Sequence, residues 1–161
     1  MPDDWFVINV ADAPAFHNER GGSSVKFEST EDRFPEYGIN IRELQPGQPN
    51  GKYHRENVQE DFLVLSGECI AIVNGEERPL RAWDFLHCPA GTEHIFVGAG
   101  DGPCHILMVG ARRPHKRLDY HPNELAARHG ASVEEPTSVP SEAYADWTRE
   151  FTPTQLNWPP G

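Results

Sequence analysis

Basic residues are scarce in this 161-residue sequence, which has 14 Lys and Arg against 25 Asp and Glu and a formal net charge of −11. Nucleic acids and anionic membranes bind clustered Lys and Arg, so this balance argues against both as partners. No apolar run approaches the roughly 20 residues of a membrane span. The first residues, MPDDWFVINV, are acidic and contain no signal-peptide core, so we expect a cytoplasmic protein.

Cysteine is scarce as well. The three cysteines, Cys69, Cys88 and Cys104, are an odd number without C-x-x-C spacing. They therefore argue against a disulfide framework and against a zinc knuckle. Cys69 lies in the apolar run ECIAIV and has the surroundings of a small buried side chain. Cys88, in LHCPAG, is the cysteine that could face a functional site.

Helical periodicity is missing from residues 37–112. Apolar runs such as YGINIREL, ECIAIV, HIFVG and CHILMVGAR alternate with turn signals, among them Ser66-Gly67 and Asn74-Gly75. Asn-Gly between apolar runs favours a β-hairpin, and many short strands with Gly and Pro turns are typical of a sandwich or barrel. We therefore predict an all-β core over residues 37–112, in a chain long enough for one domain.

The segments on either side of this core have a different character. In residues 1–36, WFVINV predicts a strand and NERGGSS a mobile loop, both packed on the core. In residues 113–161, HPNELAARHG predicts a short helix that Gly130 stops, and PSEAYADWTREF predicts a second one. The prolines of TPTQLNWPPG argue against regular structure there. We expect this C-terminal extension to pack on the outside of the core or on a partner subunit.

Charged groups interrupt the strand pattern in YHRENVQEDFLVLSG. Side chains alternate along a strand, so Lys52 and Glu56 share the face of His54. Glu60 opens the next apolar segment, and His94 follows the turn PAGTEH. Two imidazoles and one carboxylate with open positions form the facial triad that binds divalent metals such as Fe(II), and a metal offsets the cost of burying a carboxylate. His54, Glu60 and His94 are therefore candidate metal ligands.

The same stretch resembles the first motif of the cupin superfamily. Gly47 or Gly51 precedes His54, Glu56 stands where a second His is usual, Glu60 follows, and Gly67 closes the motif. The second cupin motif is matched by Pro89, Gly91 and His94, with Gly98 in place of its Asn and Trp83-Asp84 in place of Gly-Asp. The resemblance spans residues 47–98. It implies a single-domain small cupin: an antiparallel jelly-roll β-barrel, commonly dimeric, with a metal inside the barrel.

Position 56 departs from the usual cupin pattern, because this chain offers two His and two Glu where three His and one Glu are usual. The 3-hydroxyanthranilate 3,4-dioxygenases have a similar spacing, and the resemblance to them implies His54, Glu60 and His94 as ligands and Glu56 as a non-ligand. Their substrate arginines are replaced here by Asn50 and Gly98, so their specific activity is not implied. The residues alone leave open whether Glu56 is a fourth metal ligand or a catalytic acid or base.

Three functions remain open from the sequence. The first is a mononuclear metal enzyme of the dioxygenase type acting on a small molecule, with Fe(II) favoured over Zn, Mn or Ni. The second is a sugar-phosphate isomerase-like cupin with Glu56 as the base. The third is a non-catalytic cupin that binds a small molecule. Lys52 and Arg42 are the basic residues best placed to meet an anionic substrate. The remaining histidines are mostly surface candidates, although His87 and His105 lie in strands and one of them could line the pocket.

Overall fold

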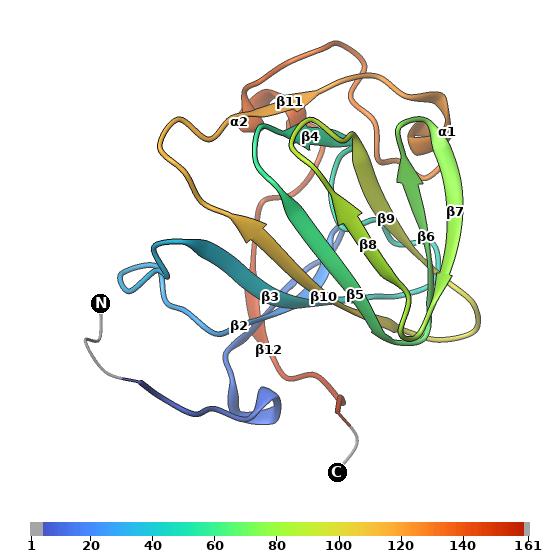
Figure 1. Cartoon of the computed structure of the whole chain (residues 1–161). Coiled ribbons are helices and arrows are strands. Elements are labelled where there is room, and N and C mark those ends of the chain that lie inside the picture. Colours follow the sequence, from blue (N-terminus) through green and yellow to red (C-terminus); the bar gives the residue numbers. More distant parts are fainter. Residues whose placement is uncertain (1–4, 160–161) are drawn as a thin grey trace.

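The structure, a computed structural model, describes residues 5–159. Two antiparallel β-sheets face each other in it (Figure 1). The larger sheet has the strand order β12-β1-β2-β3-β10-β5-β8, and its strands are β1 (Ala15–Asn18), β2 (Gly22–Lys26), β3 (Tyr37–Leu44), β5 (Glu60–Ser66), β8 (Phe85–Cys88), β10 (Cys104–Ala111) and β12 (Thr152–Thr154). The predicted all-β class and jelly-roll architecture are confirmed.

The smaller sheet has the order β11-β4-β9-β6-β7. Its strands are β4 (His54–Glu56), β6 (Glu68–Val73), β7 (Glu76–Arg81), β9 (His94–Ala99) and β11 (Leu118–Tyr120). The helical elements are the 3-10 turn η1 (Val10–Asp12) and two single-turn helices, α1 (Glu124–Ala127) and α2 (Pro140–Ala143). None of the described helices has the length and hydropathy of a membrane span.

Both predicted turns are present, but only Asn74-Gly75 closes a β-hairpin, because β5 and β6 belong to different sheets and do not pair. Asn74 and Gly75 connect β6 to β7 with φ of 47° and 79°, the left-handed geometry that Asn-Gly adopts readily. Gly67 connects β5 to β6 with φ of 74°, and a Cβ there would lie 2.5 Å from the carbonyl oxygen of Pro103. These local signals bring β6 and β7 together as neighbours and place β5 in the opposite sheet.

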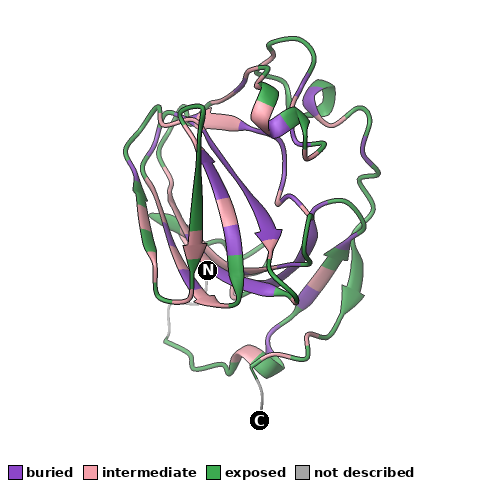
Figure 2. Ribbon diagram, turned by 90° about the vertical axis from the view of Figure 1, so that its right-hand side faces the viewer, coloured by how far each residue is buried: buried purple, intermediate pink, exposed green. Residues whose placement is uncertain are grey.

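The main core lies between the inner faces of the two sheets. Phe62 and Val64 of β5, Ile106 of β10 and Phe96 of β9 belong to one buried cluster, each at most 4% exposed. The buried strands cross the middle of the molecule in Figure 2, whereas exposed residues gather on the outer strands and loops. Each such side chain contributes roughly 1.5–3 kcal/mol by burial, so this cluster holds the two sheets at the distance that positions the inward polar groups.

Two predictions for the N-terminal segment were wrong in detail. WFVINV forms no strand: residues 5–9 are irregular, and η1 begins at Val10, where the Asn9 side chain accepts a hydrogen bond from the Ala11 amide. No strand of the described sheets pairs with this segment, and Val7 is 87% exposed. NERGGSS is a tight hairpin rather than a mobile loop, because its ends lie in β1 and β2.

The C-terminal extension is more regular than its prolines suggest. The two predicted helices are present as single turns, and Asn123 caps α1 by accepting from the Ala126 amide. The expectation that TPTQLNWPPG lacks regular structure was wrong for Thr152–Thr154, which pair with β1 as the edge strand β12. Pro153 is tolerated because an edge strand leaves one row of its N–H groups unpaired. The extension also supplies β11, which pairs with β4 beside His54.

Candidate metal centre

Three strands from the two sheets bring the predicted ligands together. His54 of β4 and His94 of β9 are directly paired across neighbouring strands, and their ring centroids are 4.9 Å apart. Glu60 reaches them from β5 in the other sheet, with Oε2 3.2 Å from Nε2 of His94. One ligand atom from each of the three residues lies within 4.8 Å of the others. Strand parity and the packing of the sheets thus place two imidazoles and a carboxylate at one point.

Backbone carbonyls orient both imidazole rings. Nδ1 of His54 lies 2.7 Å from the Lys52 carbonyl oxygen, and Nδ1 of His94 lies 3.0 Å from the Thr92 carbonyl oxygen. A carbonyl only accepts, so each Nδ1 carries the proton and donates it. Each Nε2 then presents a lone pair toward the other ligands, which is the tautomer that binds a metal. The trio therefore fits a divalent cation.

Burial and neighbouring charge set the ionisation of the trio. Burial, with repulsion from His94, lowers the pKa of His54 to about 4, so this ring is neutral at pH 7. Burial alone would raise the pKa of Glu60. The hydrogen bond between Glu60 and His94, together with the attraction of both imidazole rings, outweighs burial and lowers the pKa of Glu60 below its ordinary value. Burial opposes protonation of His94, yet Glu60 outweighs it and raises the pKa of His94. A carboxylate and a neutral His54 are the forms that coordinate metal.

Glu56 lies beside the trio and contacts a cation from the extension. Its Oε1 is 3.8 Å from Nε2 of His54, and its Oε2 is 2.6 Å from Nζ of Lys116. The carboxylate is buried, and this burial together with the charge of Glu60 raises the pKa of Glu56 in spite of Lys116. Glu56 is thus close enough to exchange a proton with a group held at His54, and one of its oxygens is already bound.

Apolar and small residues surround the trio. The ring centroid of Phe62 lies 5.2 Å from that of His94, and the ring of Tyr120 lies 5.7 Å from that of His54. Gly110 lies opposite Glu60 on β10, and a Cβ there would make an ordinary van der Waals contact, 3.6 Å from Cγ of Glu60. Cys88 is the residue of β8 paired with Glu60 and is buried. Burial and the charge of Glu60 raise the pKa of the Cys88 thiol to about 12, which keeps it protonated at pH 7.

The structure places the other expected pocket residues elsewhere. His87 is half-exposed and bonded to Asp61 at 2.6 Å. His105 is buried between Ser66 at 2.7 Å and Glu43 at 2.8 Å, away from the trio. Neither of these two histidines, which were alternatives for the lining of the pocket, contacts the trio.

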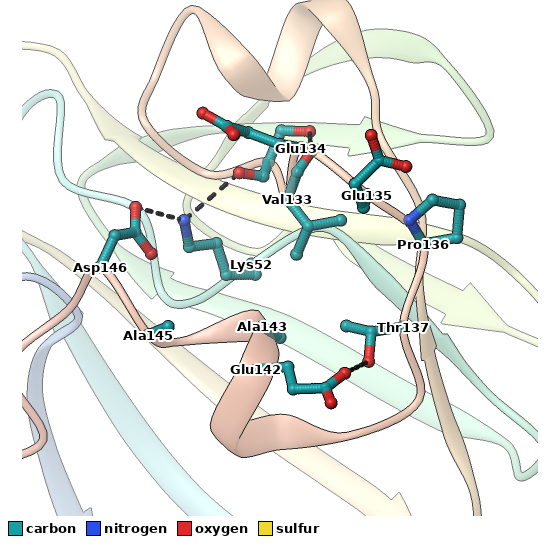
Figure 3. Close-up of a pocket in the computed structure, with 11 residues that line it drawn as sticks. Lys52, Val133, Glu134, Glu135, Pro136, Thr137, Glu142, Ala143, Ala145 and Asp146 are labelled. Atoms are coloured by element: carbon teal, nitrogen blue, oxygen red, sulfur yellow. Dashed lines mark hydrogen bonds and ion pairs between the residues drawn. The ribbon is translucent and has the colours of Figure 1, made fainter.

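Lys52 also points away from the trio. Its Nζ contacts Oδ2 of Asp146 at 2.9 Å and the Ser132 carbonyl at 3.3 Å, beneath a cavity in the C-terminal extension (Figure 3). That cavity, of about 390 Å³, carries Glu134, Glu135 and further acidic residues, and it does not include any of the trio. Lys52 thus connects the core to the extension, and its ammonium group is already paired with a carboxylate.

Two residues beside the trio were missed in the sequence analysis. Lys116 and Tyr120 follow the core in the extension and carry no motif. Nothing in their spacing marks them, because β11 is positioned by pairing with β4 and not by a local signal. A hydrophobic-polar alternation over LDY is too short to predict a strand.

The comparisons with known proteins agree with this geometry. The family model described as "Cupin domain" matches residues 40–110. The strand-rich core of this chain matches this family model and has the cupin fold. Gly98, which replaces the usual Asn of the second cupin motif, has a structural reason: a Cβ there would lie 2.1 Å from the carbonyl oxygen of Gln45. No curated protein matches the sequence.

Solved structures resemble this cupin domain in fold. A sugar phosphate isomerase of the cupin superfamily from Silicibacter pomeroyi aligns over 87% of this chain and 80% of that chain, at 23% identity and a TM-score of 0.56. The polyketide cyclase RemF from Streptomyces resistomycificus aligns over 70% and 84%, at 19% identity and a TM-score of 0.59. Against an Acidithiobacillus ferrooxidans protein the alignment covers 61% of this chain and 65% of that chain, slightly less than two thirds, at 22% identity and a TM-score of 0.54. These likenesses show the fold alone.

Proposed function

We propose that His54, Glu60 and His94 hold a divalent metal ion and that this cupin is a dioxygenase-type enzyme acting on a small molecule. The observation that carries the proposal is the convergence of three ligand atoms within 4.8 Å. Two imidazoles and one carboxylate leave coordination positions free for a substrate. A redox-active ion such as Fe(II), which we favour over Zn, Mn or Ni, supplies the electron transfer that oxygen chemistry needs.

The protein's own residues prepare this site. The Lys52 and Thr92 carbonyls hold the two rings so that both Nε2 atoms face Glu60. The ring of Phe62, which belongs to the buried core cluster, packs beside the ring of His94. The ligand set carries one negative charge, which leaves a divalent complex with a net positive charge. An anionic oxygen of a substrate is therefore attracted to the free positions.

A second candidate function rests on Glu56. Its Oε1 lies 3.8 Å from Nε2 of His54, so a substrate bound at the trio would meet a carboxylate that can take and return a proton. This is the arrangement that an isomerase requires, and one solved structure with the same fold is a sugar phosphate isomerase. Non-catalytic binding of a small molecule is the third candidate and is the conclusion if neither reaction is observed.

Metal analysis of the purified protein tests the ligand set. We expect one equivalent of a divalent transition metal in the parent and its loss in His54→Ala and in His94→Ala. His87→Ala, an exposed histidine outside the trio, is the matched control and should keep the metal. If either trio variant binds metal as well as the parent does, the ligand set is wrong.

Two assays then distinguish the reactions. Oxygen consumption with catechol-like and thiol substrates reports a dioxygenase, and incorporation of solvent deuterium into sugar phosphates reports an isomerase. Glu56→Gln should abolish deuterium incorporation while it leaves metal content intact. The cupin resemblance also favours a homodimer, which light scattering after gel filtration would measure. We propose a cytoplasmic location, which cell fractionation would test.

A further inference from the structure

A second cavity, of about 220 Å³, lies between β3 and the C-terminal extension. Arg42 of β3 and Asn50 line one side of it, and Tyr144, Trp147, Arg149 and Phe151 of the extension line the other. The cavity thus contains two guanidinium groups and three aromatic rings. None of its lining residues, all within the described part of the chain, is Asp or Glu. Two cations without a carboxylate are unusual in a protein with a formal net charge of −11.

Arg42 is partly buried and has no counter-ion among the described residues. Its Nη1 donates a 3.0 Å hydrogen bond to the Gly21 carbonyl, whereas its Nε is buried and has no acceptor among residues 5–159. Burial lowers the pKa of this guanidinium, against a smaller attraction from Tyr144. A buried cation is destabilising unless an anion compensates it, and no carboxylate of the described residues forms an ion pair with Arg42.

Two more donors around the cavity lack a good acceptor. The indole Nε1 of Trp147 is buried and unbonded within the described structure. Asn50 uses Oδ1 to accept from the Phe96 amide at 2.9 Å, but its Nδ2 has only the Met108 sulfur, at 4.0 Å. Buried N–H groups are nearly always bonded in folded proteins. Two donors without an acceptor, Nε of Arg42 and Nε1 of Trp147, lie on residues that line one cavity, and a third, Nδ2 of Asn50, has only a sulfur acceptor. These donors indicate a ligand rich in acceptor atoms.

We propose that this cavity binds a small organic carboxylate with a flat apolar body. The planar guanidinium of Arg42 matches a carboxylate in a two-bond arrangement, and Arg149 adds a second positive charge. The rings of Tyr144 and Trp147, with centroids 5.3 Å apart, offer apolar surface to the body of the ligand. The volume lies below the about 300–1,000 Å³ of sites for drug-sized ligands, so the ligand has the size of benzoate.

This carboxylate site is separate from the candidate metal centre. The ring of Tyr120 stands between them, 5.7 Å from His54 on one side and 5.8 Å from Tyr144 on the other. The inference therefore does not rest on a bound metal or on a particular reaction.

The indole N–H of Trp147 provides a local reporter for the test. The full chain, labelled with ¹⁵N, has four tryptophans, and the indole signal missing from Trp147→Phe belongs to Trp147. Titration with sodium benzoate should shift this signal saturably. Arg42→Met and Arg149→Gln should each weaken binding at least about tenfold, because each removes a guanidinium from the carboxylate. Arg81→Gln, at an exposed arginine of β7, should leave the affinity unchanged.

Several outcomes would overturn the proposal. One is a Trp147 signal that millimolar benzoate does not move. Another is an equal shift with neutral benzyl alcohol, which would mean that the charge is not recognised. An equal affinity for inorganic phosphate would indicate a general anion site and refute the flat apolar body. Arg149 is exposed, so we expect Arg149→Gln to fold. If Arg42→Met does not fold, the affinity of Arg149→Gln for benzoate still tests the proposal. Loss of metal in His54→Ala bears on the metal centre alone and leaves this titration unaffected.

Discussion

Nζ of Lys116 lies 2.6 Å from Oε2 of Glu56, whose other oxygen lies 3.8 Å from Nε2 of His54. A residue of the extension thus holds the carboxylate that stands where a cupin usually has a second histidine. One oxygen of Glu56 is occupied by the ammonium group, and the three closely grouped ligand atoms belong to His54, Glu60 and His94. This geometry favours Glu56 as a neighbour of the metal and not as a ligand.

Glu56 and Glu60 should therefore differ in their effect on metal affinity. Glu60→Gln removes a proposed ligand and should lower the affinity for Zn²⁺ by more than about 100-fold, whereas Glu56→Gln should lower it by about tenfold or less, as expected for a group outside the ligand set. Competition with a chromogenic chelator measures both. Equal losses in the two variants would make Glu56 a fourth ligand.

Metal should also stabilise the folded chain. A ligand that binds only the folded state stabilises it by about 2.7 kcal/mol at 100 times its dissociation constant. Addition of EDTA to metal-loaded protein should therefore lower Tm by several degrees. His94→Ala, which cannot form the site, should show the same Tm with and without EDTA. A Tm of the parent that does not respond to metal would contradict a site that is formed only in the folded protein.

The ion pair of Glu28 and Arg112 should make stability depend on pH. Glu28 accepts hydrogen bonds from Arg112, at 2.8 Å to Nη1, and from the Phe34 amide at 2.6 Å. The bond to Arg112 outweighs burial and lowers the pKa of Glu28 below 4.5. A depressed carboxyl pKa stabilises the folded state above the unfolded-state value, and this contribution disappears as the pH falls through the folded-state value.

Glu28→Gln should accordingly lower the free energy of unfolding by about 1 kcal/mol at pH 7, and by much less at a pH below the lowered pKa of Glu28. Urea titrations at the two pH values measure the difference. Glu31→Gln, at an exposed carboxyl in the same segment, is the control and should have no effect at either pH. If Glu28→Gln lowered the free energy of unfolding equally at both pH values, the charge of Glu28 would not be the source of its stabilising effect.

The two partners of the Lys52 ion pair should not be equivalent. The side chain of Lys52 is 3% exposed and that of Asp146 66% exposed. Asp146→Ala leaves a buried ammonium group with the Ser132 carbonyl as its main acceptor and should cost about 1 kcal/mol. Lys52→Met removes the buried charge and keeps an apolar stem, so it should cost less. Thermal unfolding measures both costs. Glu135→Ala is the control, because Glu135 lines the same cavity but is directed away from Lys52 (Figure 3). A larger loss of stability in Lys52→Met than in Asp146→Ala would contradict this account.

Local signals account for what could be predicted. The turns at Ser66-Gly67 and Asn74-Gly75 follow from backbone conformations that those residues adopt readily, although only the second closes a hairpin. The alternation along the strands places His54 and Glu60 on inward faces. The strand expected in WFVINV failed because β-propensity does not provide a partner. The edge strand containing Pro153 was missed for the opposite reason, since a partner, β1, was available.

The sequence by itself determined the all-β class, the cupin resemblance and the trio of His54, Glu60 and His94, because each depends on short-range spacing and on strand parity. Only the tertiary structure decided what surrounds them. Three features join the core to an extension that is 60 or more residues away in the chain: Lys116 beside Glu56, Tyr120 beside His54, and the cavity of Arg42 and Trp147. Contacts of this kind arise from the packing of whole elements, and no residue pattern along the chain encodes them locally.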